Sequence, residues 1–154
     1  MHISIGDKNL TNENKFIKDD CSNFIYENKI ISHTVNGISR FLILWIINYN
    51  KCIHGYAIMK EWDNFFDSLI KEGLIKKSSP SKIYPILKKM EEEELIKSHS
   101  KIQENQEVKF YQMTEKGVYL LYFIQKRFFK IKKSSMGNLF FEDFLDNGNW
   151  DYTS

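Results

Sequence analysis

The sequence predicts a mostly α-helical fold with one small β-hairpin. Apolar residues recur at helical intervals in several stretches, and a later segment alternates between apolar and polar residues around a polar tip, as paired strands do. The chain has 154 residues, of which 42% are hydrophobic and 15% aromatic. This length and composition suit one core with appendages, and they argue against collagen-like, low-complexity and disordered chains.

The first half of the chain is predicted to be helical. Apolar residues at helical spacing predict an amphipathic helix over about 13–28. Asn36-Gly37 has the chemistry of a turn, and the mostly apolar residues 38–49 after it are too many for an ordinary strand, so they predict a buried helix. A second helix is expected over about 55–67, where large apolar side chains form a stripe.

Ser79 and Pro80 mark the start of a third helix. The Ser79 hydroxyl can accept a hydrogen bond from a free N–H of the first turn, and Pro80 suits the first helical position because a missing N–H costs nothing there. This helix is predicted to have one apolar edge and a polar, basic opposite face. Residues 96–100 and 108–113 then alternate as strands do, on either side of the polar tip 103–106, and predict a hairpin.

Thr114 is predicted to cap a last long helix over about 115–133. An acidic residue lies in the first turn of this helix and five basic residues lie toward its end, which both suit the helix dipole. Ser134 to Gly137 are expected to end the helix. Residues 138–154 then form an acidic, aromatic tail, with one short turn expected at 139–145.

The order of these elements, three helices followed by a hairpin and a further helix, is typical of a winged helix-turn-helix. Such a module places its third helix in the DNA major groove and lays its hairpin, the wing, along the flanking backbone or minor groove. We therefore expect four parts: an N-terminal extension with a helix over 1–33, a winged helix-turn-helix DNA-binding domain over 34–114, a dimerisation helix over 115–133, and an acidic aromatic tail over 134–154.

The charge distribution agrees with this order. The whole chain carries a formal charge of only +2, yet residues 68–133 carry +7 and residues 134–154 carry −4. The predicted third helix and wing lie in the basic segment, and clustered basic side chains attract nucleic acid.

Four blocks of sequence resemble the PadR family of transcriptional regulators. They are HGYAIMK at 54–60, SPSKIYPILKKME at 79–91, Leu95-Ile96, and FYQMTEKG at 110–117, and they stand in the family's order. The resemblance covers about residues 38–133. It implies a winged-helix domain followed by a helix that mediates homodimerisation, with the dimer repressing transcription from operators that have two half-sites. In some family members a phenolic acid or a planar drug releases the DNA.

One position departs from the family pattern. Glu94 stands after the acidic run of the third helix, where the family usually has glycine. Glycine adopts the left-handed conformation that ends many helices at little cost. Glu94 must therefore either take that conformation at some cost or shift the helix end.

Side chains on the third helix and on the wing are the candidate DNA contacts. Lysine and serine suit phosphate oxygens and base edges, and a tyrosine can pack along the backbone with its hydroxyl on a phosphate. The candidates are Ser81, Lys82, Tyr84, Lys88 and Lys89 on the helix, Lys101 and Lys109 on the hairpin, and Arg40 in the first matching helix. The alternative interpretation of such a lysine-rich face is a solvated surface.

An aromatic stripe on the last helix predicts a homodimer, because one helix at the end of a small domain needs a partner to cover its apolar face. The stripe contains Val118, Leu121, Tyr122, Phe128 and Phe129. A small planar aromatic effector could also stack between the subunits. The candidate stacking surfaces are Trp45, Trp62, Tyr119, Tyr122 and Phe123.

No catalytic, cofactor or metal site is expected. The four histidines are scattered, Cys52-x-His54 lacks two further ligands at metal spacing, and no GxSxG, Walker or GxGxxG pattern occurs. The longest apolar run, 41–47, is too short to span a membrane, and no secretory signal is visible. Because the two cysteines also suit a reducing compartment, a cytoplasmic location is expected.

Two alternatives remain open at this point. The first is a winged-helix regulator of another class, resembling MarR, whose dimer is held by N- and C-terminal helices together. The second is a winged-helix module that binds proteins, with the acidic tail mimicking nucleic acid.

Overall fold

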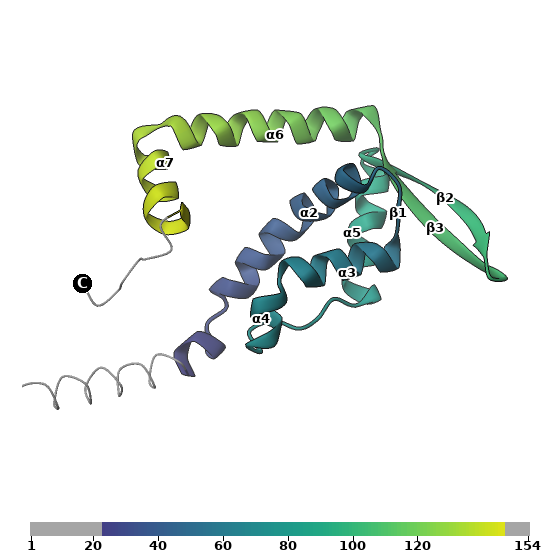
Figure 1. Cartoon of the computed structure of the whole chain (residues 1–154), viewed down its shortest axis with the longest axis horizontal. Helices are drawn as coiled ribbons and strands as arrows, with labels where there is room; N and C mark the ends of the chain where they lie inside the picture. The colour runs from purple at the N-terminus through teal and green to yellow at the C-terminus, as the bar shows by residue number, and fades with distance from the viewer. Residues whose placement is uncertain (1–22, 147–154) are drawn as a thin grey trace, which may run out of the picture.

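The computed structural model describes residues 23–146, and its fold is mostly helical with one small antiparallel sheet, as predicted (Figure 1). The elements in chain order are α2 (Ile30–Asn50), β1 (Ile53–His54), α3 (Gly55–Phe65), α4 (Asp67–Lys71), α5 (Pro80–Glu92), β2 (Ile96–Gln103), β3 (Gln106–Met113), α6 (Glu115–Lys133), α7 (Ser135–Phe140) and the π-helix η1 (Phe141–Asp146). Residues 23–27 are helical, and the part of the helix predicted over 13–28 that precedes them lies outside the described residues.

The core helix α2 begins earlier than the sequence pattern predicts. It runs without a break through Asn36 and Gly37, so the predicted turn at these two residues is wrong. Val35 is buried one position before them, and Gly37 lies on the exposed side, where a helix tolerates glycine at a cost of about 1 kcal/mol. The helix also crosses the boundary expected between residues 33 and 34.

Among the described residues, α2 is the one helix that is long and apolar enough to cross a membrane by length and composition. Such a test is also passed by the core helix of a folded domain. In this protein the middle of α2 is packed against other helices, with Ile43 and Ile47 fully buried.

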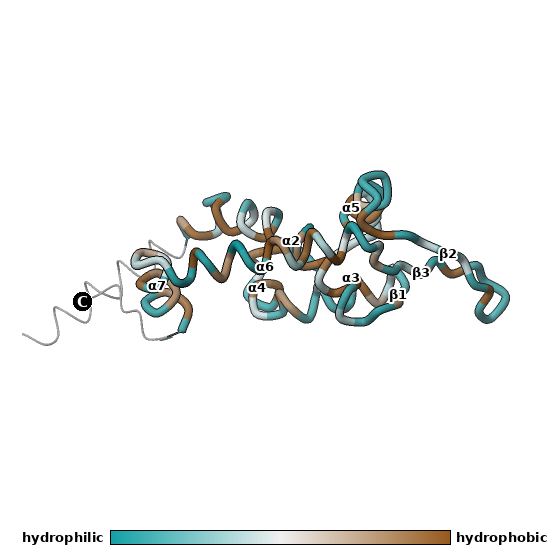
Figure 2. Tube along the Cα trace, turned by 90° about the horizontal axis from the view of Figure 1, so that it is seen from above, coloured by the Kyte–Doolittle hydropathy of each residue, from teal (hydrophilic) through white to brown (hydrophobic). Residues whose placement is uncertain are grey.

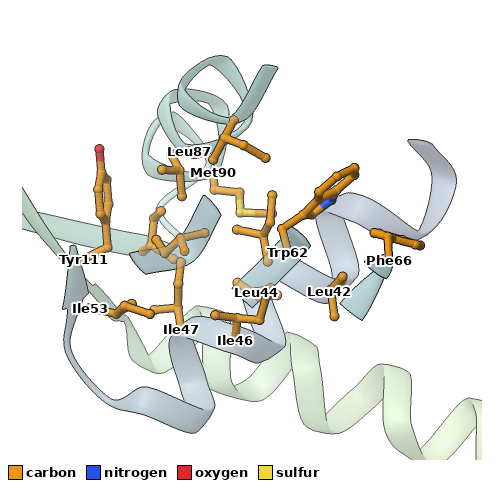
Figure 3. Close-up of a cluster of buried hydrophobic side chains, with 14 of the residues drawn as sticks. Leu42, Leu44, Ile46, Ile47, Ile53, Trp62, Phe66, Leu87, Met90 and Tyr111 are labelled. Carbon is orange, nitrogen blue, oxygen red and sulfur yellow. The ribbon is translucent and has the colours of Figure 1, made fainter. Parts of the chain in front are cut away.

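The hydrophobic core lies where α2, α3 and α5 meet the base of the sheet (Figure 3). Ile47 of α2, Trp62 of α3 and Leu87 of α5 are completely inaccessible to solvent. Ile53 of β1 and Tyr111 of β3 are buried at the edge of this cluster and attach the sheet to the helices. The core therefore fixes the orientation of α5 relative to the hairpin.

A buried hydrogen bond inside this core joins α3 to α2. The indole Nε1 of Trp62 donates to the Ser39 hydroxyl at 3.0 Å, and that hydroxyl donates to the carbonyl oxygen of Val35 at 2.6 Å. Both Trp62 and Ser39 are buried, so the serine satisfies an indole N–H that has no access to water.

Replacing Ser39 by Ala should lower the free energy of unfolding by about 1–3 kcal/mol, because the Trp62 N–H would lose its acceptor while staying buried. Urea unfolding followed by tryptophan fluorescence measures this loss. Ser32→Ala on the same helix is the matched control, since the Ser32 hydroxyl bonds only the carbonyl of Lys29. Equal stability of the two variants would contradict the role given to Ser39.

The start of α5 is where the sequence predicts it, but its cap is different. Pro80 occupies the first turn as expected. The Ser79 side chain makes no capping hydrogen bond, so that prediction is wrong; its hydroxyl lies 3.0 Å from the Ser81 hydroxyl instead. The second predicted helix also ends at Phe65, and the separate short helix α4 follows it.

The sheet has the strand order β1-β3-β2, with all neighbours antiparallel. β2 and β3 pair from Ile96↔Met113 to Gln103↔Gln106, so the hairpin is longer and its tip shorter than predicted. The two residues of the tip, Glu104 and Asn105, both have positive φ, at 50° and 64°. Positive φ at both positions belongs to the type I′ turn, whose twist suits a two-residue hairpin connection.

The last long helix has the predicted bounds, and Thr114 caps it by accepting a hydrogen bond from the Gly117 N–H at 3.0 Å. Ser134 does more than end α6, because its side chain also caps α7 by accepting from the Gly137 N–H at 3.1 Å. α6 lies beside α2 near the sheet and diverges from it farther along, and α7 turns sharply away from the end of α6 (Figure 1). Hydropathy alternates along α6, whereas the hairpin tip is mainly hydrophilic (Figure 2).

Candidate nucleic-acid interface

An open cleft of about 1030 Å³ separates α5 from the hairpin. Four of the predicted DNA-contacting residues line it together, Ser81, Tyr84 and Lys88 from α5 and Lys109 from β3. The remaining lining residues are Pro80, Pro85, Glu91, Glu92 and Tyr111. The structure thus brings the exposed face of α5 and one face of the wing to a single concave surface.

Tyr84 owes its position in this cleft to Gly55. A Cβ atom on Gly55, the first residue of α3, would lie only 2.6 Å from the Tyr84 hydroxyl oxygen and 2.8 Å from its ring. The tyrosine ring therefore packs against bare backbone while the side chain remains 41% exposed. His54 holds this end of α3 by accepting a hydrogen bond from the Ala57 N–H at 3.1 Å.

Lys82 does not share the cleft with the other candidates on α5. Its ammonium group lies 4.1 Å from the centre of the Trp62 ring, and the residue borders a separate hollow between α2 and the loop before α5. Partial burial lowers the pKa of Lys82, and the nearby Asp63 carboxylate only partly opposes this effect. Lys89 is exposed but does not line the cleft either.

The two predicted wing lysines lie on opposite faces of the hairpin. Lys109 faces α5 together with Tyr111, whose pKa is raised to about 12 by burial and by the nearby Tyr84 and Glu91. Lys101 packs on the other face, 5.0 Å from the centre of the Phe110 ring. Lys101 pairs with Val108, the neighbour of Lys109 on β3, and neighbours along a strand face opposite sides, so the two lysines lie on opposite faces.

Arg40 is engaged in an ion pair. One guanidinium nitrogen donates to both carboxylate oxygens of Glu93, at 2.9 and 3.0 Å, and thereby joins α2 to the end of α5. Both side chains remain partly exposed. Sequence reasoning did not find this pair, because the two residues lie 53 positions apart.

The acidic run at the end of α5 is paired within the chain rather than solvated throughout. Glu91 contacts Lys109, Glu93 contacts Arg40, and Glu94 contacts Lys116. Three of the four glutamates are therefore partnered by basic side chains, although Glu91 and Glu92 line the cleft.

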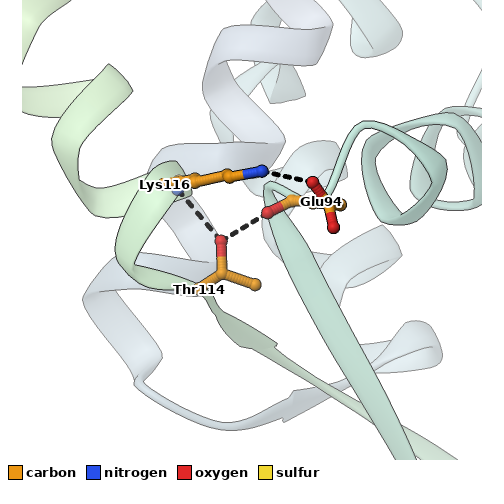
Figure 4. Close-up of polar contacts among 4 residues, drawn as sticks. Glu94, Thr114 and Lys116 are labelled. Atoms are coloured by element: carbon orange, nitrogen blue, oxygen red, sulfur yellow. Dashed lines mark hydrogen bonds and ion pairs between the residues drawn. The ribbon is translucent and has the colours of Figure 1, made fainter.

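Glu94 takes the left-handed conformation, with φ at 59°, so the helix end is not shifted. The next N–H, that of Leu95, donates to the Met90 carbonyl at 2.9 Å, as in the Schellman ending of a helix. The Thr114 hydroxyl donates to the Glu94 carbonyl at 2.6 Å, and the Lys116 ammonium pairs with the Glu94 carboxylate (Figure 4). Contacts from the start of α6 therefore hold a conformation that glutamate adopts at a cost.

A second concave surface lies between α2 and α6. It has a volume of about 700 Å³ and is lined by all five predicted dimerisation residues, Val118, Leu121, Tyr122, Phe128 and Phe129, together with Phe41 and Trp45 of α2. Phe41 and Phe128 stack with ring centres 6.4 Å apart, yet Phe128 stays 56% exposed. We call this surface the α2–α6 groove.

The proposed stacking residues for an effector are only partly in this groove. Trp45 and Tyr122 line it, whereas Tyr119 and Phe123 do not. Trp62 is fully buried in the core under Ser39 and Lys82, so its assignment as a stacking surface is wrong. Within residues 23–146, no group of three or more His, Cys, Asp or Glu side chains could hold a metal ion.

Comparison with known proteins agrees with this fold. Residues 43–121 match the model of the transcriptional regulator PadR-like family. The crystal structure of a PadR-like transcriptional regulator from Bacillus cereus is similar with a TM-score of 0.54 and 23% identity, over 70% of this chain and 95% of that chain. A PadR family transcriptional regulator from Eggerthella lenta gives a TM-score of 0.54 and 19% identity, over 80% and 96% of the two chains.

A putative transcriptional regulator from Thermoplasma acidophilum is similar with a TM-score of 0.50 and 22% identity, over 70% of this chain and 94% of that chain. No curated protein matches significantly. The family model spans just over half of the chain, and it includes α3, α5, the whole sheet and the start of α6. The chain therefore belongs to the PadR-like family of transcriptional regulators.

Proposed function

We propose that this protein is a cytoplasmic homodimer that binds a pseudo-palindromic DNA operator and represses transcription. In this proposal α5 enters the major groove and the hairpin lies on the flanking backbone. The observation that carries it is the cleft in which Ser81, Tyr84 and Lys88 of α5 face the same surface as Lys109 of the wing. Serine, tyrosine and lysine side chains that share a concave surface on a recognition helix suit base edges and phosphates.

The structure supports the candidate DNA contacts to different degrees. Of the residues that line the cleft, the four predicted contacts are exposed toward one surface and form the central contact with DNA. Lys89 would add a phosphate contact at the side of α5, and Lys101 would meet DNA only through the opposite face of the wing. Lys82 and Arg40 would reach DNA only by leaving Trp62 and Glu93, so we assign them the weakest contacts.

The homodimer is supported by the α2–α6 groove. Its aromatic lining is half exposed in the single chain, and a two-fold copy of α6 would cover it. Two copies of α5 related by this axis would address two half-sites, which is how dimeric helix-turn-helix proteins read palindromes. A small planar aromatic effector would enter beside Trp45 and Tyr122.

The same proposal assigns a function to each segment of the chain. Residues 34–114 supply DNA binding, 115–133 supply dimerisation, and 1–33 and 134–154 are appendages to this unit. The family match does not favour a MarR-like class, and it agrees with the expectation that the protein is not an enzyme. The alternative that the protein is a winged-helix module that binds another protein is distinguished by the experiment below.

Selection of genomic DNA fragments by the purified protein, followed by titration of the enriched duplex, tests the proposal. Retention of fragments with an inverted repeat is the expected result. Affinity for the enriched duplex should fall steeply between about 50 and about 200 mM salt, because lysine–phosphate contacts release counterions. If no fragment is enriched, or if affinity is independent of salt, the proposed function is wrong and a protein partner is indicated.

Replacing Lys88 by Ala should reduce the slope of log affinity against log salt concentration by about 1, because one phosphate contact in the cleft is lost. Fluorescence anisotropy with the selected duplex at several salt concentrations measures the slope. Lys71→Ala is the control, since Lys71 lies on α4 and pairs with Asp67 at 2.7 Å. The same slope for Lys88→Ala and the wild type would remove Lys88 from the contact surface.

A further inference from the structure

An acidic side chain stands inside the cleft that we assign to DNA. Glu91 lines it opposite the wing, one turn after Lys88 on α5. A carboxylate at this position repels DNA phosphates and reduces the attraction that the neighbouring lysines provide. A surface that only had to attract DNA would bind it more tightly without this charge. The contacts of Glu91 indicate what the carboxylate does there instead.

The Glu91 carboxylate contacts both strands of the hairpin. One oxygen accepts a hydrogen bond from the Ser98 hydroxyl on β2, and the other accepts from the Lys109 ammonium on β3 at 3.4 Å. Ser98 and Lys109 lie on the same face of the hairpin, because Ser98 pairs with Tyr111 and Lys109 with Ser100. A single side chain of α5 thus links the recognition helix to each wing strand.

These contacts keep Glu91 charged. Partial burial raises the pKa of Glu91, but the Ser98 hydrogen bond and the charge of Lys109 together outweigh burial, so the pKa lies below its ordinary value. The Glu91 side chain is the less exposed member of the pair, at 31% against 50% for the Lys109 side chain. Within the described residues the Lys109 ammonium makes this one hydrogen bond, which leaves two of its three N–H donors available to a phosphate.

The next residue provides an internal comparison. Glu92 lines the same cleft and carries the same charge, but it is exposed, and within the described part of the chain it has no hydrogen bond or ion pair. If a glutamate affects DNA affinity only through its negative charge, removing the charge from Glu91 or from Glu92 should have the same effect. An effect that depends on the contacts with Ser98 and Lys109 of the wing should be seen for Glu91 alone.

We propose that Glu91 is a positioning residue that determines specificity by holding the wing and Lys109 against α5, so that Lys109 reaches a phosphate only when α5 is seated on its operator. On other DNA α5 does not seat in this way, and the restrained Lys109 cannot follow the backbone. Glu91 therefore lowers the affinity for arbitrary DNA more than the affinity for the operator. This inference rests on the proposed function.

The test compares Glu91→Gln with Glu92→Gln in the full chain, each titrated with the selected duplex and with a random-sequence duplex of equal length. Glutamine keeps the size of the side chain and an oxygen that can accept from Ser98, and thermal unfolding of each variant checks the fold. For Glu91→Gln, affinity for random DNA should rise about threefold to tenfold more than affinity for the selected duplex. The salt slope on random DNA alone should steepen by about 0.9, because the freed Lys109 adds one phosphate contact.

Glu92→Gln should raise both affinities alike and leave their ratio unchanged. In the double variant Glu91→Gln with Lys109→Met, the extra slope on random DNA should disappear. If Glu91→Gln and Glu92→Gln change the ratio equally, or if the extra slope persists without Lys109, the inference is wrong while the proposed function stands. If the wild type does not distinguish the two duplexes, the proposed function fails and this inference fails with it.

Discussion

Replacing Gly117 by Ala should lower the free energy of unfolding by about 3 kcal/mol, because the added methyl group has no space. A Cβ atom at this position would overlap the carbonyl oxygen of Leu95 and would lie 3.0 Å from its carbonyl carbon and 3.1 Å from the Met113 Cε. The Leu95 carbonyl also accepts the Thr114 N–H at 3.1 Å. Backbone, not a flexible side chain, would have to move, and the junction of α5, β2 and α6 would open.

Urea unfolding of wild type and variant at one protein concentration measures the loss, since a dimer's apparent stability depends on concentration. Gly37→Ala is the matched control. Gly37 lies on the exposed side of α2, and a Cβ there meets nothing within 4 Å, so alanine should stabilise the helix by about 1 kcal/mol. A Gly117→Ala variant as stable as the wild type would mean that α6 does not approach Leu95 as closely as described.

Replacing Phe128 by Asp should convert the dimer to a monomer and weaken operator binding at least about 100-fold. Phe128 lies in the α2–α6 groove against Phe41 and is half exposed in the single chain, so a charge there would be buried without a partner in any dimer that covers the groove. Separating two linked half-sites removes the gain from simultaneous binding. Analytical ultracentrifugation and anisotropy titration measure the two effects.

The control for this change is Tyr119→Asp on the same helix. Tyr119 is 68% exposed and does not line the groove, so this variant should remain a dimer with nearly wild-type operator affinity. A dimeric Phe128→Asp protein would show that the subunits meet elsewhere. A wild-type protein that is monomeric and still binds an inverted repeat tightly would contradict the proposed homodimer.

The helical domain and its wing could be predicted in outline because their signals are local. Pro80 predicts the start of α5, Thr114 predicts the start of α6, and period-two alternation predicts the hairpin. The errors are also local in origin. Gly37 permits a helix as well as a turn, and β1 has only two residues, too few to show a strand pattern.

The candidate site was predicted less completely. The basic face of α5 was identified from its sequence spacing, but that spacing does not tell which lysine packs over Trp62 and which faces the wing. Strand alternation alone could not have separated Lys101 from Lys109, because the faces of residues on two different strands are related only once the register of the hairpin is known. Glu91 carried no signal in the sequence beyond its place in an acidic run.

Periodicity, capping residues and charge are properties of neighbouring positions, so they were enough to predict the main helices and the hairpin, the family and the basic character of α5 and the wing. Which charges remain available for a partner depends on contacts between distant segments. Arg40 is paired across 53 positions, Lys82 lies over an aromatic ring, and Lys109 is held by Glu91. These partners meet because the buried core fixes α2, α5 and the hairpin relative to one another, and that arrangement is not encoded in the spacing of any single segment.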